Sequence, residues 1–131
     1  MKFALVTDLH FGARSDSLSF DNHFRKFYEE VFFPELERQG IKTVFDLGDT
    51  FDRRKYINFN TLKSCKEYFF DELEKRGIDL HMIPGNHDTY FKNTNDVNSP
   101  DLLLRDYNNI ALYQKVTEIK MGESTVLFVP W

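Results

Sequence analysis

The sequence contains very little cysteine and no long apolar segment. Cys65 is the single cysteine among 131 residues, so no disulfide bond can form within the chain. This scarcity fits a reducing compartment. The N-terminal apolar run, residues 3–6, is too short for a signal peptide or a membrane span. We therefore expect a soluble, cytoplasmic protein with no membrane association.

Positive charge is also scarce. The chain has 17 lysine and arginine residues against 21 acidic ones, which gives a net charge of −4. Proteins that hold nucleic acid by charge alone are usually basic. A polyanionic ligand would therefore need a local basic patch or bound cations. Apolar residues are plentiful at 41%, including 14 phenylalanines, so the chain can bury a core and is not expected to be disordered.

Two kinds of hydrophobic spacing alternate along the first 83 residues. Short apolar runs at 3–6, 41–47 and 78–83 predict three buried strands. Apolar residues at helical spacing predict helices over 20–32 and about 61–76. Because buried strands alternate with helices, we expect an α/β fold built from parallel strand–helix–strand units with right-handed crossovers.

Capping residues, prolines and glycines set the expected ends of the helices. Ser19 is the predicted N-cap of the first helix, and Pro34 should kink that helix or begin a new turn. Gly40 and Gly77 are expected to end the two helices. Ser99-Pro100 predicts the start of a short helix over 101–107. Strands are further expected at 110–113, 116–121 and 125–129, with a C-terminal hairpin that turns at 121–124.

Polar side chains follow each of the first three predicted strands. The strands end in the stretches "DLH" (8–10), "GDTFDR" (48–53) and "GNHD" (85–88). Ligands of open parallel sheets sit beyond the carboxyl ends of the strands, so these side chains should share one rim. Oxygen and imidazole donors without a thiolate suit Mn²⁺, Mg²⁺, Fe²⁺ or Zn²⁺.

The spacing of these donors also suits metal binding. Asp8 and His10 would point the same way in extended backbone and could hold one ion. Asp49 has two oxygens that could bridge two ions, and Asn86 offers a neutral carbonyl oxygen. The alternative is that Asp8, Asp49 and Asn86 are turn and cap residues, for which aspartate and asparagine are favoured.

The order of the three stretches resembles the calcineurin-like metallophosphoesterases, whose motifs read D-x-H, G-D-x-x-D-[RN] and G-N-H-[DE]. The match covers residues 1–90. The wording "DLHFG", "GDTFDRR" and "GNHD" is closer to the SbcD-type branch of double-strand-break-repair nucleases than to the protein phosphatases. Within that branch it resembles the recombination endonuclease subunits of T-even-type phages most closely.

The resemblance implies a role for each motif residue. Asp8 and His10 would hold the first ion, Asp49 would bridge two ions and Asn86 would hold the second. His87 would contact the scissile phosphate and assist the leaving oxygen, and the Asp52 carboxylate would lie behind His87 and orient it. The implied cofactor is a pair of divalent ions, with Mn²⁺ as our first expectation.

The family pattern is incomplete in this sequence. It requires three further histidines, two of them in a G-H-x-H motif, and no histidine follows His87. We therefore interpret residues 1–131 as the N-terminal part of a metallophosphoesterase domain, one half of a two-sheet sandwich that is truncated before the last ligand motifs. We expect this part to be inactive alone.

The implied activity is metal-dependent hydrolysis of DNA, as an exonuclease or endonuclease in recombination and double-strand-break repair. The implied partners are an SbcC-type coiled-coil ATPase and a second copy of the chain, paired through the helices near 61–76 and 101–107. If the protein is phage-encoded, it would act in the host cytoplasm. Two alternatives stay open: a phosphomonoesterase or small-nucleotide phosphodiesterase of the same fold, and a catalytically dead protein-binding scaffold.

Residues outside the motifs have two interpretations each. Arg14, Arg53 and Arg54 could contact the DNA backbone or could belong to solvated loops. Tyr90 and Phe91 could stack on an unpaired base, although packing beneath their loop is favoured. The remaining assignments are structural, with a hydrogen-bonded strand histidine at 81, a solvent-facing histidine at 23 and a core cysteine at 65.

Overall fold

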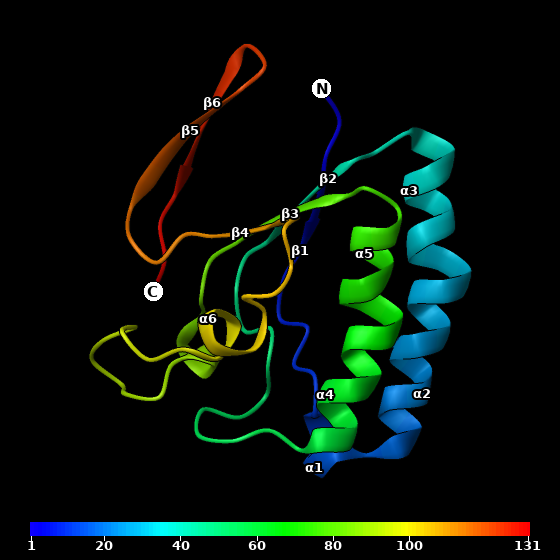
Figure 1. Ribbon diagram of the computed structural model, residues 1–131, viewed down its shortest axis with the longest axis vertical. Helices are drawn as coiled ribbons and strands as arrows, with labels where there is room; N and C mark the ends of the chain where they lie inside the picture. Colours follow the sequence, from blue (N-terminus) through cyan, green and yellow to red (C-terminus); the bar gives the residue numbers. More distant parts are fainter.

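A four-stranded parallel sheet forms the centre of the computed structural model, which describes residues 1–131 (Figure 1). Its strands lie in the order β1-β2-β3-β4 and all pair in parallel. They are β1 (Ala4–Val6), β2 (Thr43–Asp46), β3 (Asp79–Met82) and β4 (Ile110–Leu112). The chain then forms an antiparallel hairpin of β5 (Thr117–Met121) and β6 (Ser124–Phe128). The predicted α/β fold with a parallel sheet and a C-terminal hairpin is confirmed.

Two helical rods lie side by side on one side of the sheet, and the hairpin lies on the other (Figure 1). Each rod is a succession of α-helix, wider π-type turn and α-helix. The first contains α2 (Leu18–Phe27), η1 (Tyr28–Phe32) and α3 (Phe33–Gln39), and the second contains α4 (Phe59–Cys65), η2 (Lys66–Phe70) and α5 (Asp71–Lys75). Shorter helices are α1 (Ala13–Asp16), η3 (Asn86–Asp88) and α6 (Ser99–Leu103). None of the helices combines the length and apolar character that crossing a membrane requires.

The first rod begins earlier than predicted and continues through Pro34. Ser17, rather than Ser19, is its N-cap, because the Ser17 hydroxyl accepts the Phe20 N–H at 3.4 Å. At the end of the π-type turn the Phe33 N–H bonds the Tyr28 carbonyl, five residues back. Pro34 thus falls in the first turn of α3, where its missing N–H is tolerated. The predicted new turn is present, and Gly40 ends the rod at φ 66°.

The short helix α6 also has a different cap from the predicted one. The Asn98 side chain, and not that of Ser99, accepts the Asp101 N–H at 2.9 Å. Asn98 is 1% exposed, so its position is fixed by packing as well as by this bond. The helix ends at Leu103 and not at residue 107, which shortens the surface it can offer.

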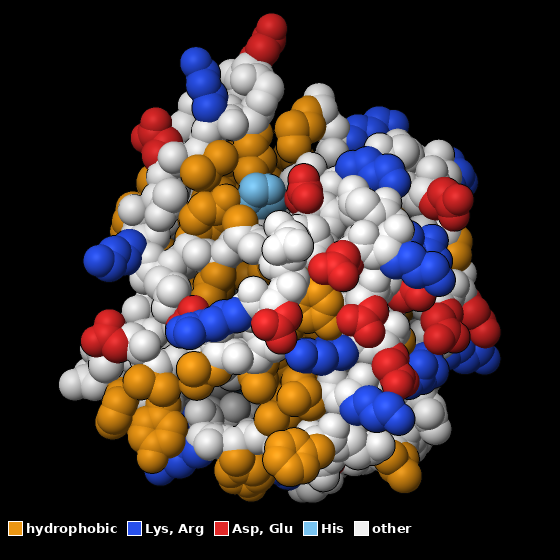
Figure 2. All heavy atoms as spheres, viewed as in Figure 1, with side chains coloured by type: hydrophobic (Ala, Val, Ile, Leu, Met, Phe, Trp, Pro, Cys, Tyr) orange, Lys and Arg blue, Asp and Glu red, His pale blue; other side chains and the backbone are white.

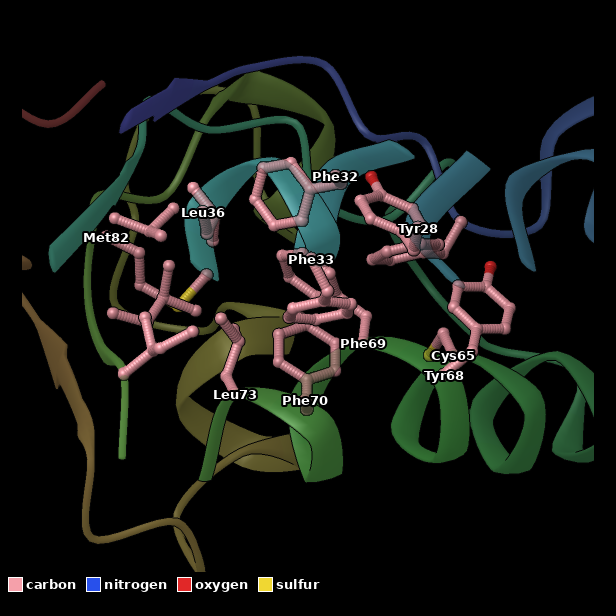
Figure 3. Close-up of a cluster of buried hydrophobic side chains, with 14 of the residues drawn as sticks. Tyr28, Phe32, Phe33, Leu36, Cys65, Tyr68, Phe69, Phe70, Leu73 and Met82 are labelled. Carbon is pink, nitrogen blue, oxygen red and sulfur yellow. The ribbon is translucent and has the colours of Figure 1, made fainter. Parts of the chain in front are cut away.

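The phenylalanines fill the space between the rods and the sheet. Figure 3 shows Tyr28, Phe32 and Phe33 of the first rod facing Phe69 and Phe70 of the second. The Phe69 ring lies 4.8 Å from that of Tyr28, and both Phe69 and Phe70 are fully buried. Cys65 is also fully buried, which confirms its place in the core. Burial raises the pKa of the Cys65 thiol to about 12, so this cysteine is unreactive.

The hairpin covers only part of the opposite face of the sheet. Its Phe128 ring meets Phe45 of β2 edge-on and stacks on Tyr113. His81 stacks beside Tyr113, and its Nδ1 lies 2.7 Å from the Tyr113 hydroxyl, which confirms a hydrogen-bonded strand histidine. Leu5 remains 59% exposed on β1. The carboxyl edge of the sheet is left open, and the three loops that follow β1, β2 and β3 meet there.

Candidate metal centre

Main-chain hydrogen bonds join the first two loops beyond the ends of their strands. The Asp8 N–H donates to the Gly48 carbonyl, and the His10 N–H donates to the Asp49 carbonyl, each at 3.0 Å. The Phe11 N–H continues this ladder to the Thr50 carbonyl at 2.9 Å. The ladder fixes the register of the two loops and thereby the relative positions of their polar side chains.

Three predicted metal ligands converge at this edge. Asp8, His10 and Asp49 each offer one ligand atom, and these atoms all lie within 4.8 Å of one another. His10 Nε2 is 3.5 Å from Asp8 Oδ1 and 4.0 Å from Asp49 Oδ2. Two carboxylates and an imidazole held this close are a donor set that suits a divalent cation.

The backbone reaches this arrangement in a way that differs from our prediction. Asp8 and His10 are not extended, because their φ angles are 55° and 47°, and Asp49 has a φ of 55°. Left-handed backbone costs a non-glycine residue about 1–2 kcal/mol. Such residues persist where surrounding structure imposes them, and they concentrate at functional sites. The left-handed turns, and not strand alternation, aim Asp8 and His10 at a common point.

Asn86 completes one side of the cluster. Its side-chain amide lies next to the Asp49 carboxylate, and with its NH₂ group turned toward Asp49 it would donate to Oδ1 at 3.3 Å and to Oδ2 at 3.2 Å. The amide can also present its oxygen, which is an acceptor that a cation can bind. Two carboxylates, an imidazole and an amide oxygen fit the divalent ions that the sequence predicts.

The cluster is open to solvent. A cleft of about 370 Å³ is lined by residues of all three loops, including Asp8, Asp49 and Asn86. The Asp8 side chain is 59% exposed, whereas that of Asp49 is 15% exposed. An ion and a phosphate group could therefore reach the cluster without rearrangement of the loops.

His87 and Asp52 are brought to the same place, but with different partners from those predicted. The Asp52 carboxylate contacts His10, with 3.1 Å between Oδ1 and Nδ1. His87 Nδ1 instead lies 3.1 Å from the main-chain carbonyl of Asp52. Our prediction that the Asp52 carboxylate orients His87 is therefore wrong. Through its carboxylate Asp52 orients the ring of His10, a predicted metal ligand, and such a contact makes an imidazole more basic.

The main chain of His87 is anchored to the cluster as well. Its N–H donates to Asp49 Oδ1 at 2.8 Å, and its ring lies 5.0 Å from that of His10 in an edge-on contact. With Nδ1–H donating to the Asp52 carbonyl, Nε2 is the ring nitrogen that makes no hydrogen bond within the chain.

Two buried carboxylates hold the loops in place: Asp88, which belongs to the GNHD stretch expected at the rim, and Asp46, for which no role was predicted. Asp88 is fully buried and accepts three main-chain N–H groups, from Thr50 at 3.3 Å, Phe51 at 3.0 Å and Gly85 at 2.9 Å. Asp46 is 1% exposed and accepts the Gly48 N–H at 3.0 Å and the Thr50 hydroxyl at 2.7 Å. The sequence did hold a signal for Asp46, since it is a carboxylate inside the apolar run of β2. A buried carboxylate needs hydrogen-bond partners, so a structural role could have been predicted for it.

Burial of Asp46 predicts an unusual pH dependence of stability. Desolvation raises its pKa to about 7, so the folded state holds this proton more tightly than the unfolded chain. The contribution of Asp46 to stability should then be present at low pH and should be lost as the pH rises from about 4 to about 7. We expect Asp46→Asn to remove about 2 kcal/mol of the wild-type decrease between pH 5 and pH 8, measured by urea unfolding in EDTA.

Asp96→Asn provides the control for this measurement, since Asp96 is an exposed loop carboxylate. That variant should keep the wild-type pH profile. An Asp46→Asn profile parallel to the wild-type one would show that Asp46 is ionised throughout.

The three arginines that were predicted to contact DNA have distinct environments. Arg53 pairs with Asp16 at 2.6 Å, and its guanidinium lies 4.9 Å over the ring of Tyr56. Arg54 lies beside the end of the chain, 6.0 Å over Trp131, and its Nη1 is buried without a hydrogen-bond partner. Arg14 stacks on Phe20 of α2 and is not part of the ligand cluster.

Comparison with known proteins agrees with this geometry. The family model described as calcineurin-like phosphoesterase matches residues 1–130. Exonuclease subunit 1 of Enterobacteria phage T4 is 32% identical over 134 residues, an alignment that covers all of this chain and 38% of that protein. This chain therefore spans a little over a third of the length of that relative. By its sequence, its fold and its cluster of metal-ligand side chains, the chain belongs to the calcineurin-like phosphoesterase family.

Proposed function

We propose that the chain forms the N-terminal part of a metal-dependent nuclease that hydrolyses phosphodiester bonds of DNA in recombination and double-strand-break repair. The convergence of Asp8, His10 and Asp49, with Asn86 beside Asp49, is the observation that carries this proposal. Similarity to a phage exonuclease subunit supports DNA as the substrate. Membership of the family supports hydrolysis of a phosphate ester.

The proposed roles follow the geometry of the cluster. Asp8 and His10 would hold a first divalent ion, Asp49 would contribute to both ion sites, and Asn86 would contribute its amide oxygen to the second. The Asp52 carboxylate keeps His10 in the orientation that ligation needs. A pair of ions, for which we propose Mn²⁺, would supply a water of lowered pKa and would neutralise charge on the phosphate.

His87 is the proposed group for the leaving oxygen. Its Nδ1 is committed to the Asp52 carbonyl, so a proton for the departing oxygen would come from Nε2. The bond from its main-chain N–H to Asp49 Oδ1 keeps His87 next to the carboxylate that would contribute to both ion sites.

Residues outside this chain would complete the second ion site. The sequence has no G-H-x-H motif, and the alignment covers 38% of the phage relative. We propose that residues 1–131 are the N-terminal part of the catalytic domain and that hydrolysis needs the remaining ligands.

The proposed partners are an ATPase subunit and a second copy of the chain. The relative is named as a subunit, which supports an assembly, and we propose an SbcC-type ATPase in the host cytoplasm. For a homodimer, Phe59 and Leu102 are 86% and 60% exposed near the two helices concerned. The apolar face of the helix over 61–76 is otherwise buried within the chain, so the contact would centre on these two side chains. A monomer mass by light scattering would contradict it.

A substrate comparison tests the proposed activity. The full-length protein with Mn²⁺ is expected to degrade linear DNA, to lose this activity in EDTA and to hydrolyse p-nitrophenyl phosphate slowly. Fast turnover of this monoester without DNA cleavage would indicate a phosphomonoesterase of the same fold. Absence of both activities together with absence of Mn²⁺ binding would indicate a protein-binding scaffold.

A further inference from the structure

One ion pair joins the loop that follows β1 to the loop that follows β2. Asp16, at the end of α1, accepts a hydrogen bond from Arg53 Nη1 at 2.6 Å, across 37 residues of sequence. Figure 2 shows acidic and basic side chains beside one another on the side of the molecule where Figure 1 places the helical rods. Exposed pairs there, such as Arg38 with Glu35, contribute little. Asp16 and Arg53 are only 13% and 28% exposed, so this pair is suited to holding two loops together.

The second oxygen of the Asp16 carboxylate reaches a third segment. Its Oδ1 accepts the Thr61 hydroxyl at 2.7 Å, and Thr61 is a buried residue of α4. The guanidinium of Arg53 also lies 4.9 Å over the ring of Tyr56. Gly12 leaves room for this arrangement, since a Cβ there would lie 2.9 Å from Asp16 Oδ1. One carboxylate therefore connects the loop after β1, the loop after β2 and the first helix of the second rod.

The main chain that carries this carboxylate is strained. Arg14, Ser15 and Asp16 have consecutive left-handed φ angles of 56°, 58° and 59°. Residues other than glycine adopt this conformation mostly one at a time, and a strained segment persists where the surrounding structure imposes it. The bonds of the Asp16 side chain to Arg53 and Thr61 are contacts that can impose it. The shape of this turn and the position of the second loop therefore depend on the same carboxylate.

Arg53 directly follows the residue that contacts both imidazoles of the site. The Asp52 carboxylate lies 3.1 Å from His10 Nδ1, and the Asp52 carbonyl lies 3.1 Å from His87 Nδ1. That carbonyl belongs to the peptide group that links Asp52 to Arg53. The Asp52 N–H is bonded to the loop after β1 at 3.1 Å, which anchors the residue on one side. The ion pair with Asp16 is the anchor on the other side, so it sets the orientation of the peptide group between them.

We propose that Asp16 and Arg53 are positioning residues of the metal centre, whose ion pair holds the peptide group after Asp52 and through it the rings of His10 and His87. The proposal rests on the proposed nuclease function for the reaction that these imidazoles serve. Neither Asp16 nor Arg53 contacts an ion or the substrate. The charge of Arg53 is thus used within the chain and not on the DNA backbone, which decides between the two interpretations that the sequence left open for this residue.

Titration calorimetry of Mn²⁺ into the full-length protein measures the effect on His10. Asp16→Asn keeps an oxygen for the Thr61 hydroxyl and tolerates left-handed backbone, but it removes the charge that faces Arg53. Arg53→Gln removes the opposite charge. Each variant should bind Mn²⁺ about tenfold more weakly, the lower end of the range for residues that support metal ligands. The double variant should bind no more weakly than either single variant, because the two side chains act as one unit.

Two further variants separate positioning from a general loss of stability. Arg53→Lys should retain most of the Mn²⁺ affinity, because the pair uses a single nitrogen of Arg53, which a lysine can supply. Arg38→Gln breaks the exposed ion pair with Glu35 on α3 and should bind Mn²⁺ as wild type does. Additive losses in the Asp16→Asn/Arg53→Gln variant, or wild-type affinity in both single variants, would show that the pair does not position His10 and would overturn the proposal.

Hydrolysis of linear DNA by the full-length protein at saturating Mn²⁺ separates positioning from substrate binding. Asp16→Asn and Arg53→Gln should both lower kcat and leave KM unchanged. A raised KM in Arg53→Gln together with wild-type kinetics in Asp16→Asn would mean that Arg53 contacts DNA directly, against the proposal. Weakened Mn²⁺ binding in both variants with no DNA cleavage by wild type would contradict the nuclease proposal alone, and absence of Mn²⁺ binding by wild type would contradict both.

Discussion

Replacing Asp49 with alanine is expected to abolish tight Mn²⁺ binding and to reduce DNA hydrolysis by the full-length protein by more than about a hundredfold, because even residues that only support metal ligands typically cost 10–100-fold when removed. The Asp49 carboxylate lies next to three other residues of the proposed site. Its Oδ2 lies 4.0 Å from His10, its carboxylate faces the Asn86 amide, and its Oδ1 accepts the His87 N–H. No other carboxylate of the cluster occupies such a central position.

Titration calorimetry of Mn²⁺ into the chain measures this effect directly, without a need for activity. Asp49→Asn is the sharper variant, since it keeps the side-chain shape and an oxygen for the His87 N–H and removes only the charge. Glu123→Gln, at an exposed position in the hairpin turn, is the control and should bind Mn²⁺ as wild type does. Wild-type affinity in Asp49→Asn would contradict the metal centre.

Stability distinguishes loss of a ligand from loss of the fold. Burial is the main cause of the raised pKa values of Asp46 and Asp88, and the charge of Asp49 raises both a little further. Removal of this charge therefore relieves repulsion among carboxylates. In EDTA the asparagine variant should therefore be at least as stable as wild type toward urea. A large loss of stability would instead mean that the negative charge of Asp49 itself stabilises the loops, since the asparagine keeps an oxygen for the His87 N–H.

The convergence of the ligand loops could be predicted because it depends on topology alone. Parallel strands present their carboxyl ends at one edge of a sheet, and the apolar runs locate those ends. Asp8, Asp49 and Asn86 were thereby placed at a common rim without knowledge of any side-chain contact. The hydrophobic spacing that predicts the strands depends on burial, which the sheet and the two rods provide.

The details of the loops could not be predicted, because polar loop segments have no periodicity. The left-handed backbone at Asp8 and His10 arises from the main-chain ladder with the second loop, which is a tertiary contact. Tertiary contacts also bring the Asp52 carboxylate to His10 and not to His87. The misassigned caps are a local case of this limit: Ser17 and Ser19, or Asn98 and Ser99, have equal capping ability, and packing decides between them.

A methyl group at Gly85 is expected to disrupt both the metal centre and the fold. Gly85 is not constrained by a positive φ; its constraint is space. A Cβ at this position would lie 2.3 Å from Asp49 Oδ1 and 2.4 Å from the Asp49 main-chain nitrogen. Gly48, which faces Gly85 across the two loops, is also crowded, because its Cβ would meet the Gly85 nitrogen at 2.7 Å. The second and third loops therefore cross at a point where neither can carry a side chain.

Gly85→Ala should therefore lower stability by at least about 3 kcal/mol, at or beyond the usual range for overpacking, since the clash includes main-chain atoms. Mn²⁺ affinity should fall with it, because Asp49 must move. Gly77→Ala is the matched control: its Cβ meets no atom within 4 Å, and only its φ of 64° is unfavourable, which costs about 1–2 kcal/mol. That control should bind Mn²⁺ normally in calorimetry. Normal Mn²⁺ binding by Gly85→Ala would mean that the ligand loops are not held at the separation described, and that Asp49 can leave its position without cost to the site.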